Sequence, residues 1–195
     1  MRLHPLRTVT VLALILIAGC SSSSKSASTS SSAVVAESSL PTSAETFTLS
    51  SPDMQSGGAM PVAFTCDGES QSPSLTWTPG PEGTVEYAIA MHHVPGPGDT
   101  HWYWVVYNSP STTYSIPAGG PAPGTLGTNS VNGELAYAPP CSKGLGEKIY
   151  TYTVYALSAA PTFPTDSQVS RDVLLDAINS TTLSSASFDV SYERS

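Results

Sequence analysis

The sequence lacks the short motifs that mark common catalytic sites. It contains no G-x-S-x-G nucleophile elbow and no H-E-x-x-H zinc motif. It also contains no internal repeat, no heptad pattern and no glycine-rich phosphate loop, which argues against a nucleotide-binding architecture. We therefore expect a protein that is not an enzyme and that needs no cofactor.

Positive charge is scarce as well. The 195 residues include 7 lysines and arginines against 15 aspartates and glutamates, which gives a formal net charge of -8 at pH 7. Two of the basic residues, Arg2 and Arg7, precede residue 20 and no acidic residue does, so loss of that segment leaves a charge of -10. An acidic body argues against nucleic acid as a partner and against electrostatic docking on anionic lipid.

The apolar run at the N-terminus, residues 9–17, is too short to span a bilayer, which takes about 20 residues. It follows Arg2 and Arg7 and leads into the sequence LIAGC at 16–20. This order is typical of a lipoprotein signal peptide over residues 1–19, with cleavage before Cys20 and diacylation of its sulfur. Two acyl chains on one residue anchor a protein stably. We therefore predict attachment through Cys20 to the cell membrane or cell envelope, outside the cytoplasm; a transmembrane helix is the alternative.

Large apolar side chains are nearly absent from the segment that follows. Residues 20–45 are mostly Ser, Ala and Thr, so this segment cannot bury enough surface to offset the entropy of ordering. We interpret it as a lipidated cysteine followed by a disordered tether. Residues 46–195 are the size of one ordinary domain with its own core.

Only three cysteines are present. If Cys20 carries lipid, Cys66 and Cys141 remain as a pair in an oxidising compartment, where a disulfide is the expected outcome. A reactive thiol or a ligand for a soft metal is the alternative.

Residues 46–195 are dominated by patterns typical of β-strands. Alternating or β-branched runs, separated by Pro and Gly, predict strands at 47–49, 62–65, 74–77, 86–92, 103–107, 114–116, 149–157 and 188–192. One apolar stripe predicts a helix that starts at Ser170 as N-cap, has Asp172 in its first turn and stops before Asn179. The fold class is therefore mainly β, with one or two short C-terminal helices.

Polar side chains gather where the strands at 86–92 and 103–107 meet. Three of the four histidines, His92, His93 and His101, lie at this junction. Positions two apart on a strand point the same way, so His93, His101 and Tyr103 can share a face while His92 points to the other. An accessible loop on a rigid scaffold is a common place for a ligand site.

Five segments, in order, resemble the phosphatidylethanolamine-binding protein family in its bacterial, Raf-kinase-inhibitor-like branch. They are PVAFTCDGESQSPSLTW at 61–77, TVEYAIAMHHVPGPG at 84–98, YWVVYNSP at 103–110, YAPPCSKG at 137–144 and YTYTVYAL at 150–157. The resemblance covers almost all of residues 46–195. It implies a β-sandwich-like domain with a small anion pocket at one end, which holds phosphate or phosphorylated headgroups. It also implies a binder or an inhibitor-like protein-interaction module rather than a catalyst.

The chain differs from the family's pattern at the polar positions of that pocket. His93 and Pro95 stand where the family has two aspartates, and Tyr103 replaces a histidine, with His101 two residues earlier. Further on, Ser142 and Lys143 replace prolines of a loop, and Lys148 stands where a second histidine is expected. Exchanging acids for groups that donate hydrogen bonds makes the pocket better suited to an anion.

From these residues we predict a pocket for a small anionic or phosphorylated ligand. The ligand-binding set is His93, His101, Tyr103, Lys148, Trp102, Asp67 and Pro140, with Trp102 as a wall at the mouth. Three alternatives remain open. His92, His93 and His101, with Asp99, could form a Zn or Cu site in a metal-binding protein or enzyme. The polar cluster could instead tie loops together in a structural envelope protein with a vestigial pocket, or the surface could serve a protein partner.

Overall fold

The computed structural model describes residues 46–194. The predicted signal peptide, the lipidated Cys20 and the tether up to residue 45 lie outside the described residues. Within residues 46–194, no helix is both long enough and apolar enough to cross a membrane.

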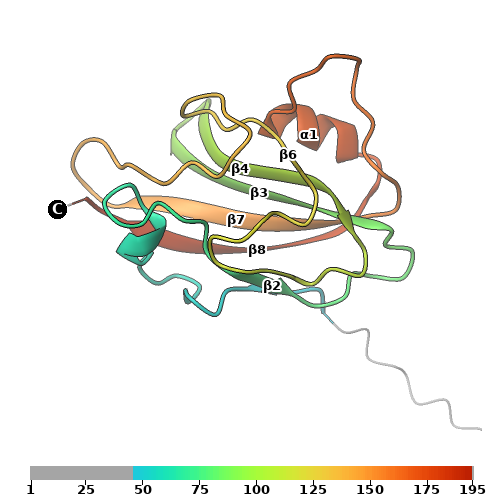
Figure 1. Ribbon diagram of the computed structural model, residues 1–195, viewed down its shortest axis with the longest axis horizontal. Coiled ribbons are helices and arrows are strands. Elements are labelled where there is room, and N and C mark those ends of the chain that lie inside the picture. Colours follow the sequence, from blue (N-terminus) through green and yellow to red (C-terminus); the bar gives the residue numbers. More distant parts are fainter. Residues whose placement is uncertain (1–45, 195) are drawn as a thin grey trace, which may run out of the picture. The chain divides into compact units, whose positions relative to one another are not determined.

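Two antiparallel sheets form the described part of the chain, as Figure 1 shows. The smaller sheet has the order β1-β2-β5, and the larger has the order β6-β4-β3-β7-β8. The strands of the smaller sheet are β1 (Leu49–Ser50), β2 (Leu75–Trp77) and β5 (Ser115–Ile116). Those of the larger sheet are β3 (Glu86–Gly96), β4 (Asp99–Pro110), β6 (Thr125–Leu126), β7 (Lys148–Leu157) and β8 (Thr182–Tyr192). The prediction of a mainly β fold is confirmed.

The larger sheet buries side chains on both of its faces. On one face, Ile89 and Met91 of β3 pack in the core that also contains Leu75 and Trp77 of the smaller sheet. On the other face, a second core lies beneath the helix α1 (Arg171–Ile178) and contains Ala88, Val105, Leu157, Val169, Leu174 and Ile178. Side chains alternate between the faces of a strand, so consecutive residues of β3 belong to different cores.

Helix α1 begins as the sequence predicts. Ser170 is its N-cap, because the Ser170 hydroxyl accepts a hydrogen bond from the backbone N–H of Val173 at 3.3 Å. Asp172 lies in the first turn, where a negative charge is favoured by the helix dipole. Leu174 and Ile178, four residues apart, are buried on one side of the helix.

The strand predicted at 62–65 is wrong. Residues Val62–Phe64 form a 3-10 turn, η1, in which Phe64 N–H donates to the Pro61 carbonyl at 3.1 Å and Thr65 N–H to the Val62 carbonyl at 3.0 Å. Three apolar residues and a threonine are too short a run for periodicity to distinguish a strand from a turn. The short strand β6 was not predicted either, since Thr125 and Leu126 follow a stretch rich in Pro and Gly.

The hairpin that joins β3 to β4 is longer than the sequence predicts. The strands extend to Gly96 and from Asp99, which pair across a two-residue turn. Gly98 has a φ of 81°, a conformation that favours glycine. His93 and His101 therefore lie on paired strands rather than in a connecting loop, and their positions are fixed by the sheet.

Candidate functional site

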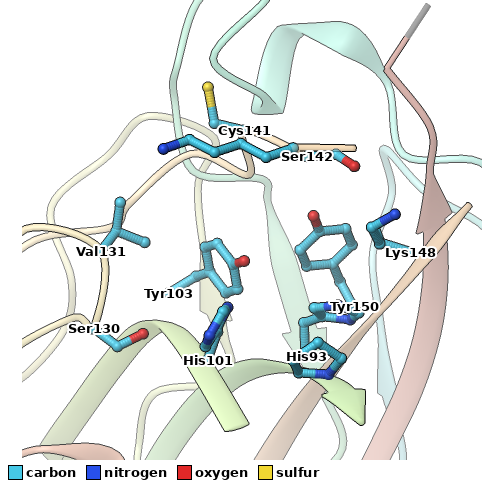
Figure 2. A pocket seen from close by; sticks show the side chains of 11 residues that line it. His93, His101, Tyr103, Ser130, Val131, Cys141, Ser142, Lys148 and Tyr150 are labelled. Atoms are coloured by element: carbon cyan, nitrogen blue, oxygen red, sulfur yellow. The ribbon is translucent and has the colours of Figure 1, made fainter. Parts of the chain in front are cut away.

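A cavity of about 340 Å³ lies at the end of the larger sheet that carries the β3–β4 hairpin. Figure 2 shows it between the β3–β4 hairpin, which carries the two imidazoles, and a loop that carries Cys141 and Ser142. Its lining comes from β3, β4, β7 and two loops: His93, Pro95, His101, Tyr103, Ser130, Val131, Cys141, Ser142, Lys143, Lys148 and Tyr150. Four of the predicted site residues, His93, His101, Tyr103 and Lys148, thus surround one cavity.

His93 and His101 are direct partners across the hairpin. His93 continues the row of alternate β3 side chains that faces the smaller sheet, and it is only 8% exposed. Its Nδ1 lies 2.8 Å from the carbonyl oxygen of Ile149. Because a carbonyl can only accept, Nδ1 donates to it and Nε2 is the nitrogen left for a ligand; Nε2 accepts in the neutral ring and donates to an anion in the imidazolium form. His101 is exposed, and its Nε2 lies 3.4 Å from Asp99 Oδ2.

Tyr103 reaches the cavity through a β-bulge. Met91 pairs with Trp104 while the next residue, His92, pairs with Trp102, so Tyr103 is an extra residue in β4. A bulge of this kind changes the direction of a side chain within a strand. Tyr103 and Trp104, although adjacent, consequently both contribute to the core between the sheets. The backbone carbonyl of Tyr103 accepts a hydrogen bond from Ala138 N–H at 2.7 Å.

Tyr150, on β7, is a lining residue that sequence reasoning missed. Its ring centroid lies 5.2 Å from that of Tyr103 and 5.3 Å from that of His93. Burial raises the pKa of both the Tyr150 and the Tyr103 phenol above its ordinary value. Both phenols therefore stay protonated at neutral pH and are able to donate hydrogen bonds. Alternation along the YTYTVYAL strand placed Tyr150 on one face, but nothing in the sequence indicated that this face reaches a cavity.

The loop opposite the imidazoles is held by a disulfide. Cys66 and Cys141 are bonded, with their Cα atoms 5.2 Å apart, as predicted from the cysteine count. Beside this bond, the backbone N–H of Cys66 donates to the Pro140 carbonyl at 3.1 Å. Pro140 is buried and does not line the cavity, so its predicted place in the ligand-binding set is corrected: it helps to fix the loop.

Lys148 begins β7, directly after the loop that carries Cys141, and its ammonium group is partly occupied by hydrogen bonds to that loop. Its Nζ donates to the carbonyl oxygens of Leu145 at 3.0 Å and of Gly146 at 2.8 Å. An ammonium group has three N–H donors, so one remains for a ligand in the cavity. Lys143, which also lines the cavity, was not in the predicted set.

Two predicted residues lie away from the cavity. Trp102 faces the α1 side of the sheet, where its indole N–H donates to the Thr128 carbonyl at 2.8 Å, so it is not a wall of the mouth. Asp67 pairs with Arg194 at 2.6 Å and accepts a hydrogen bond from the Tyr192 hydroxyl. Trp102 lies beside His92 on the α1 face of the sheet, and neither Trp102 nor Asp67 belongs to the cavity lining.

Two other lining residues, Ser130 and Val131, belong to a loop with no recognisable sequence pattern. Ser130 is tied to β4, since its hydroxyl donates to the Trp102 carbonyl at 2.9 Å and accepts from Trp102 N–H at 2.8 Å. These tertiary contacts help to bring the loop to the cavity.

The three histidines do not converge on a metal site. His92 points to the α1 face of the sheet, as alternation predicts, and is separated by the sheet from His93. Among residues 46–194, no group of three or more His, Cys, Asp or Glu side chains is arranged to hold a metal ion. The alternative site of His92, His93 and His101 is therefore not formed.

Comparison with known proteins agrees with this architecture. A model of the family described as phosphatidylethanolamine-binding protein matches residues 50–193. The chain belongs to the phosphatidylethanolamine-binding protein family. Within the family, UPF0098 protein YbcL of Escherichia coli is 31% identical over 176 residues, which cover 82% of this chain and 94% of YbcL. The putative lipoprotein LppC of Mycobacterium tuberculosis is 32% identical over 124 residues, which cover 63% of this chain and 61% of LppC.

Solved structures share the fold. The crystal structure of E. coli YbcL, described as a new member of the mammalian PEBP family, has a TM-score of 0.68 and 27% identity, and the match covers 76% of this chain and 99% of YbcL. A putative phosphatidylethanolamine-binding protein homolog from Chlamydia trachomatis has a TM-score of 0.69 and 23% identity, with 76% and 98% covered. The Chlamydia structure supports the fold alone.

Proposed function

We propose that this family member is a membrane-anchored, extracytoplasmic binding protein whose cavity takes a small anionic or phosphorylated ligand. One observation carries the proposal. Four basic side chains line the cavity, His93, His101, Lys143 and Lys148, and none of the lining residues is acidic. This concentration of donors occurs in a chain whose formal net charge is -8. Charge-assisted hydrogen bonds from such groups to phosphate or carboxylate are about twice as strong as neutral ones.

The same lining supports binding rather than catalysis. Nucleophilic catalysis needs a hydroxyl or thiol activated by a base within hydrogen-bond reach. The hydroxyl of Ser142 has no hydrogen-bond partner in the described part of the chain, and Cys141 is held in the disulfide. The cavity thus offers donors to a ligand without a paired nucleophile and base.

Three features support the membrane anchor. The first 20 residues have the order of a lipoprotein signal that leads to Cys20. The relative LppC is named a putative lipoprotein. The Cys66–Cys141 disulfide fits an oxidising compartment outside the cytoplasm. Detergent phase partitioning of the full chain tests the anchor: wild type should enter the detergent phase and Cys20→Ser the aqueous phase, whereas equal partitioning would contradict it.

Isothermal titration of the purified full chain with phosphate, phosphoethanolamine and acetate tests the pocket. At least one of these should bind, and Lys148→Met should weaken it about tenfold, because an ion-assisted hydrogen bond contributes roughly 1.5–3 kcal/mol. Arg171→Met is the matched control, since it removes the same charge from the opposite face of the larger sheet.

Two results would argue against the proposal. Absence of heat with all three ligands, from a folded protein, would remove the anion pocket. Equal weakening by Lys148→Met and Arg171→Met would show that only the net charge of the protein matters, not the cavity.

A further inference from the structure

Strand β8 is an edge strand of the larger sheet, and its outer edge is only partly covered. In the described residues, its one strand partner is β7, beside which Figure 1 shows it. Residues 57–60 pair with the outer edge near the end of the strand: Gly57 N–H donates to the Asp189 carbonyl at 2.7 Å, and Ser191 N–H donates to the Gly58 carbonyl at 2.9 Å. The chain thus extends the sheet beyond β8, but this cover stops at Asp189.

The same bonds show which β8 residues direct their backbone groups away from β7. Asp189 and Ser191 do so, and because this direction alternates along a strand, Ser185 and Ser187 do so as well. Within residues 46–194, no backbone hydrogen bond reaches Ser185 or Ser187 from outside the pairing of β7 with β8. Each of the two residues therefore presents one N–H and one C=O to the outside of the sheet.

The uncovered part of the edge is bounded on both sides. On one side, the bond from Gly57 occupies the carbonyl of Asp189. On the other side, the register between β7 and β8 shifts between Ala156 and Leu157, opposite residues 184 and 182, so the regular strand begins at Ser184. We call residues 184–188 the free stretch of β8.

The free stretch lacks the residues that usually protect an edge strand. Natural edge strands are commonly blocked by lysine or other charges, or by proline. The sequence of the free stretch is Ser-Ser-Ala-Ser-Phe, with no charge and no proline. Ser185 and Ser187 are exposed on the α1 side, whereas Ala186 and Phe188 pack against the core on the other side. Its side chains therefore leave the backbone groups open to another strand.

The free stretch is complementary to itself. If a second copy pairs with it antiparallel about a twofold axis at Ala186, Ser185 of one copy lies opposite Ser187 of the other. Such a pair exchanges two hydrogen bonds, and the axis creates the pair twice, so every outward N–H and C=O of the free stretch gains a partner. At the axis, Ala186 meets Ala186 of the second copy, where the Cα atoms approach to about 4.5 Å and a small side chain is needed.

We infer that the free stretch of β8 is the contact surface for a second copy of this chain, and that two copies pair there antiparallel about Ala186. Alternating N–H and C=O groups on a strand edge match another strand, and this mode continues the pairing that residues 57–60 already make with β8. No charge lies in the free stretch to oppose contact between copies that each carry a formal charge of -8. A twofold contact of this kind closes on itself, so it gives dimers rather than fibres.

The contact is small, so the dimer should be weak and reversible. A strand pair of this length buries less than the roughly 1,200 Å² of a standard stable interface. The net charge of -8 on each copy also opposes association at a distance. Added salt screens this repulsion and should raise the fraction of dimer.

Disulfide cross-linking tests the pairing and its register. The experiment uses the full chain with Cys20→Ser, in which Cys66 and Cys141 are already bonded to each other. Ser185→Cys and Ser187→Cys are made separately and then mixed under mild oxidation. The two cysteines lie opposite each other in the inferred dimer, at a Cα separation of about 5.5 Å that suits a disulfide. The mixture should therefore cross-link about tenfold faster than either variant alone.

Ser115→Cys is the matched control for cross-linking. Ser115 is also an exposed serine, but it lies on β5 of the smaller sheet. A mixture of Ser115→Cys with Ser187→Cys measures the rate of random collision. If Ser185→Cys with Ser187→Cys cross-links no faster than this control mixture, the inference is overturned. Faster cross-linking of Ser185→Cys alone than of the mixture would also overturn it, because the axis would then lie at residue 185.

Sedimentation velocity of the same full chain, up to about 1 mM, tests the backbone contact. The protein should form dimers, and Ser187→Pro should abolish them, because proline removes an outward N–H. That N–H has no partner within the monomer, so the variant should melt near the temperature of its parent. Ser187→Lys keeps the backbone, adds a charge and should also prevent dimers. A chain that stays monomeric throughout, or dimers that persist in both variants, would show that the free stretch is not the contact surface.

Discussion

His92 and His93 are adjacent on β3 and identical in chemistry, yet they lie in opposite environments. His93 faces the cavity, where its Nδ1 bonds to the Ile149 carbonyl at 2.8 Å and its ring packs against Tyr150. His92 faces the α1 side, where its Nδ1 is buried with no hydrogen-bond partner among residues 46–194. Burial lowers the pKa of His92, and the positive charge of Arg171 lowers it further.

The difference shows that the face of the sheet, rather than the residue type, decides what a histidine can do here. Next to His93, the sheet faces the loop that follows Cys141, and a cavity of about 340 Å³ lies between them. Next to His92, the same strand faces the side on which helix α1 packs. A search for clustered histidines in the sequence would group the two residues, although the sheet separates them.

Removal of the disulfide should have the largest effect, both on the stability of the whole domain and on the cavity at the His93 face. Replacing both Cys66 and Cys141 by Ser removes a cross-link between residues that are 75 positions apart. The chain-entropy model predicts that this lowers the free energy of unfolding by about 4 kcal/mol. Denaturant unfolding measures this loss. Anion affinity should also fall at least tenfold, because the disulfide positions the loop that carries Ser142 and Lys143. Unchanged affinity in the folded variant would contradict the role of the loop.

Replacing each histidine by Phe should separate the two faces more directly. His93→Phe keeps a ring against Tyr150 but removes the nitrogen that faces the cavity, so phosphate affinity should fall about tenfold. His92→Phe should leave the affinity within twofold, since His92 is on the other side of the sheet. Calorimetric titration of both variants measures the difference. Equal losses of phosphate affinity in the two variants would show that both histidines affect binding, and would contradict the separation of the two faces.

The smallest expected effect is a change of stability with pH, which we attribute to the protonation of His92. Its folded-state pKa is lowered, mainly by burial, so the unfolded chain binds a proton that the folded chain does not. Stability from this group is present above the unfolded pKa, about 6.5, and is lost as pH falls from there toward the lowered folded pKa. The groups around it are Arg171, Asp189, His93 and Asp172.

Unfolding free energies of wild type and His92→Phe at pH 7.5 and pH 5 measure this contribution. Wild type should lose more stability between the two values than the variant does. The same loss in both proteins would show that a group other than His92 causes the fall in stability between pH 7.5 and pH 5.

Much of the scaffold was predictable from local patterns. The row Tyr87, Ile89 and Met91 identifies one face of β3, and the predicted pairing of Cys66 with Cys141 is present in the structure. The Ser170 cap and the apolar stripe of α1 were also correct. The turn at 62–65 was not predictable, because three apolar residues and a threonine fit a strand and a turn equally well.

The candidate site was only partly predictable. Alternation correctly placed His93, His101 and Tyr103 on one face, but it could not anticipate the bulge that lets the adjacent Tyr103 and Trp104 both face the core between the sheets. Trp102 and Asp67 were misplaced because their partners, Thr128 and Arg194, are distant in the sequence.

The sequence by itself determined which side chains lie on which face of the strands, because alternation is a local property of extended backbone. It also predicted the bond between Cys66 and Cys141, on the hypothesis that Cys20 carries lipid. Only the tertiary structure decided that one face opens into a cavity, that the loop after Cys141 closes over it, and that the hydroxyl of Ser142 is left buried without a partner. The physical reason is that a cavity is the space between segments distant in the chain, and its size and lining depend on how those segments pack.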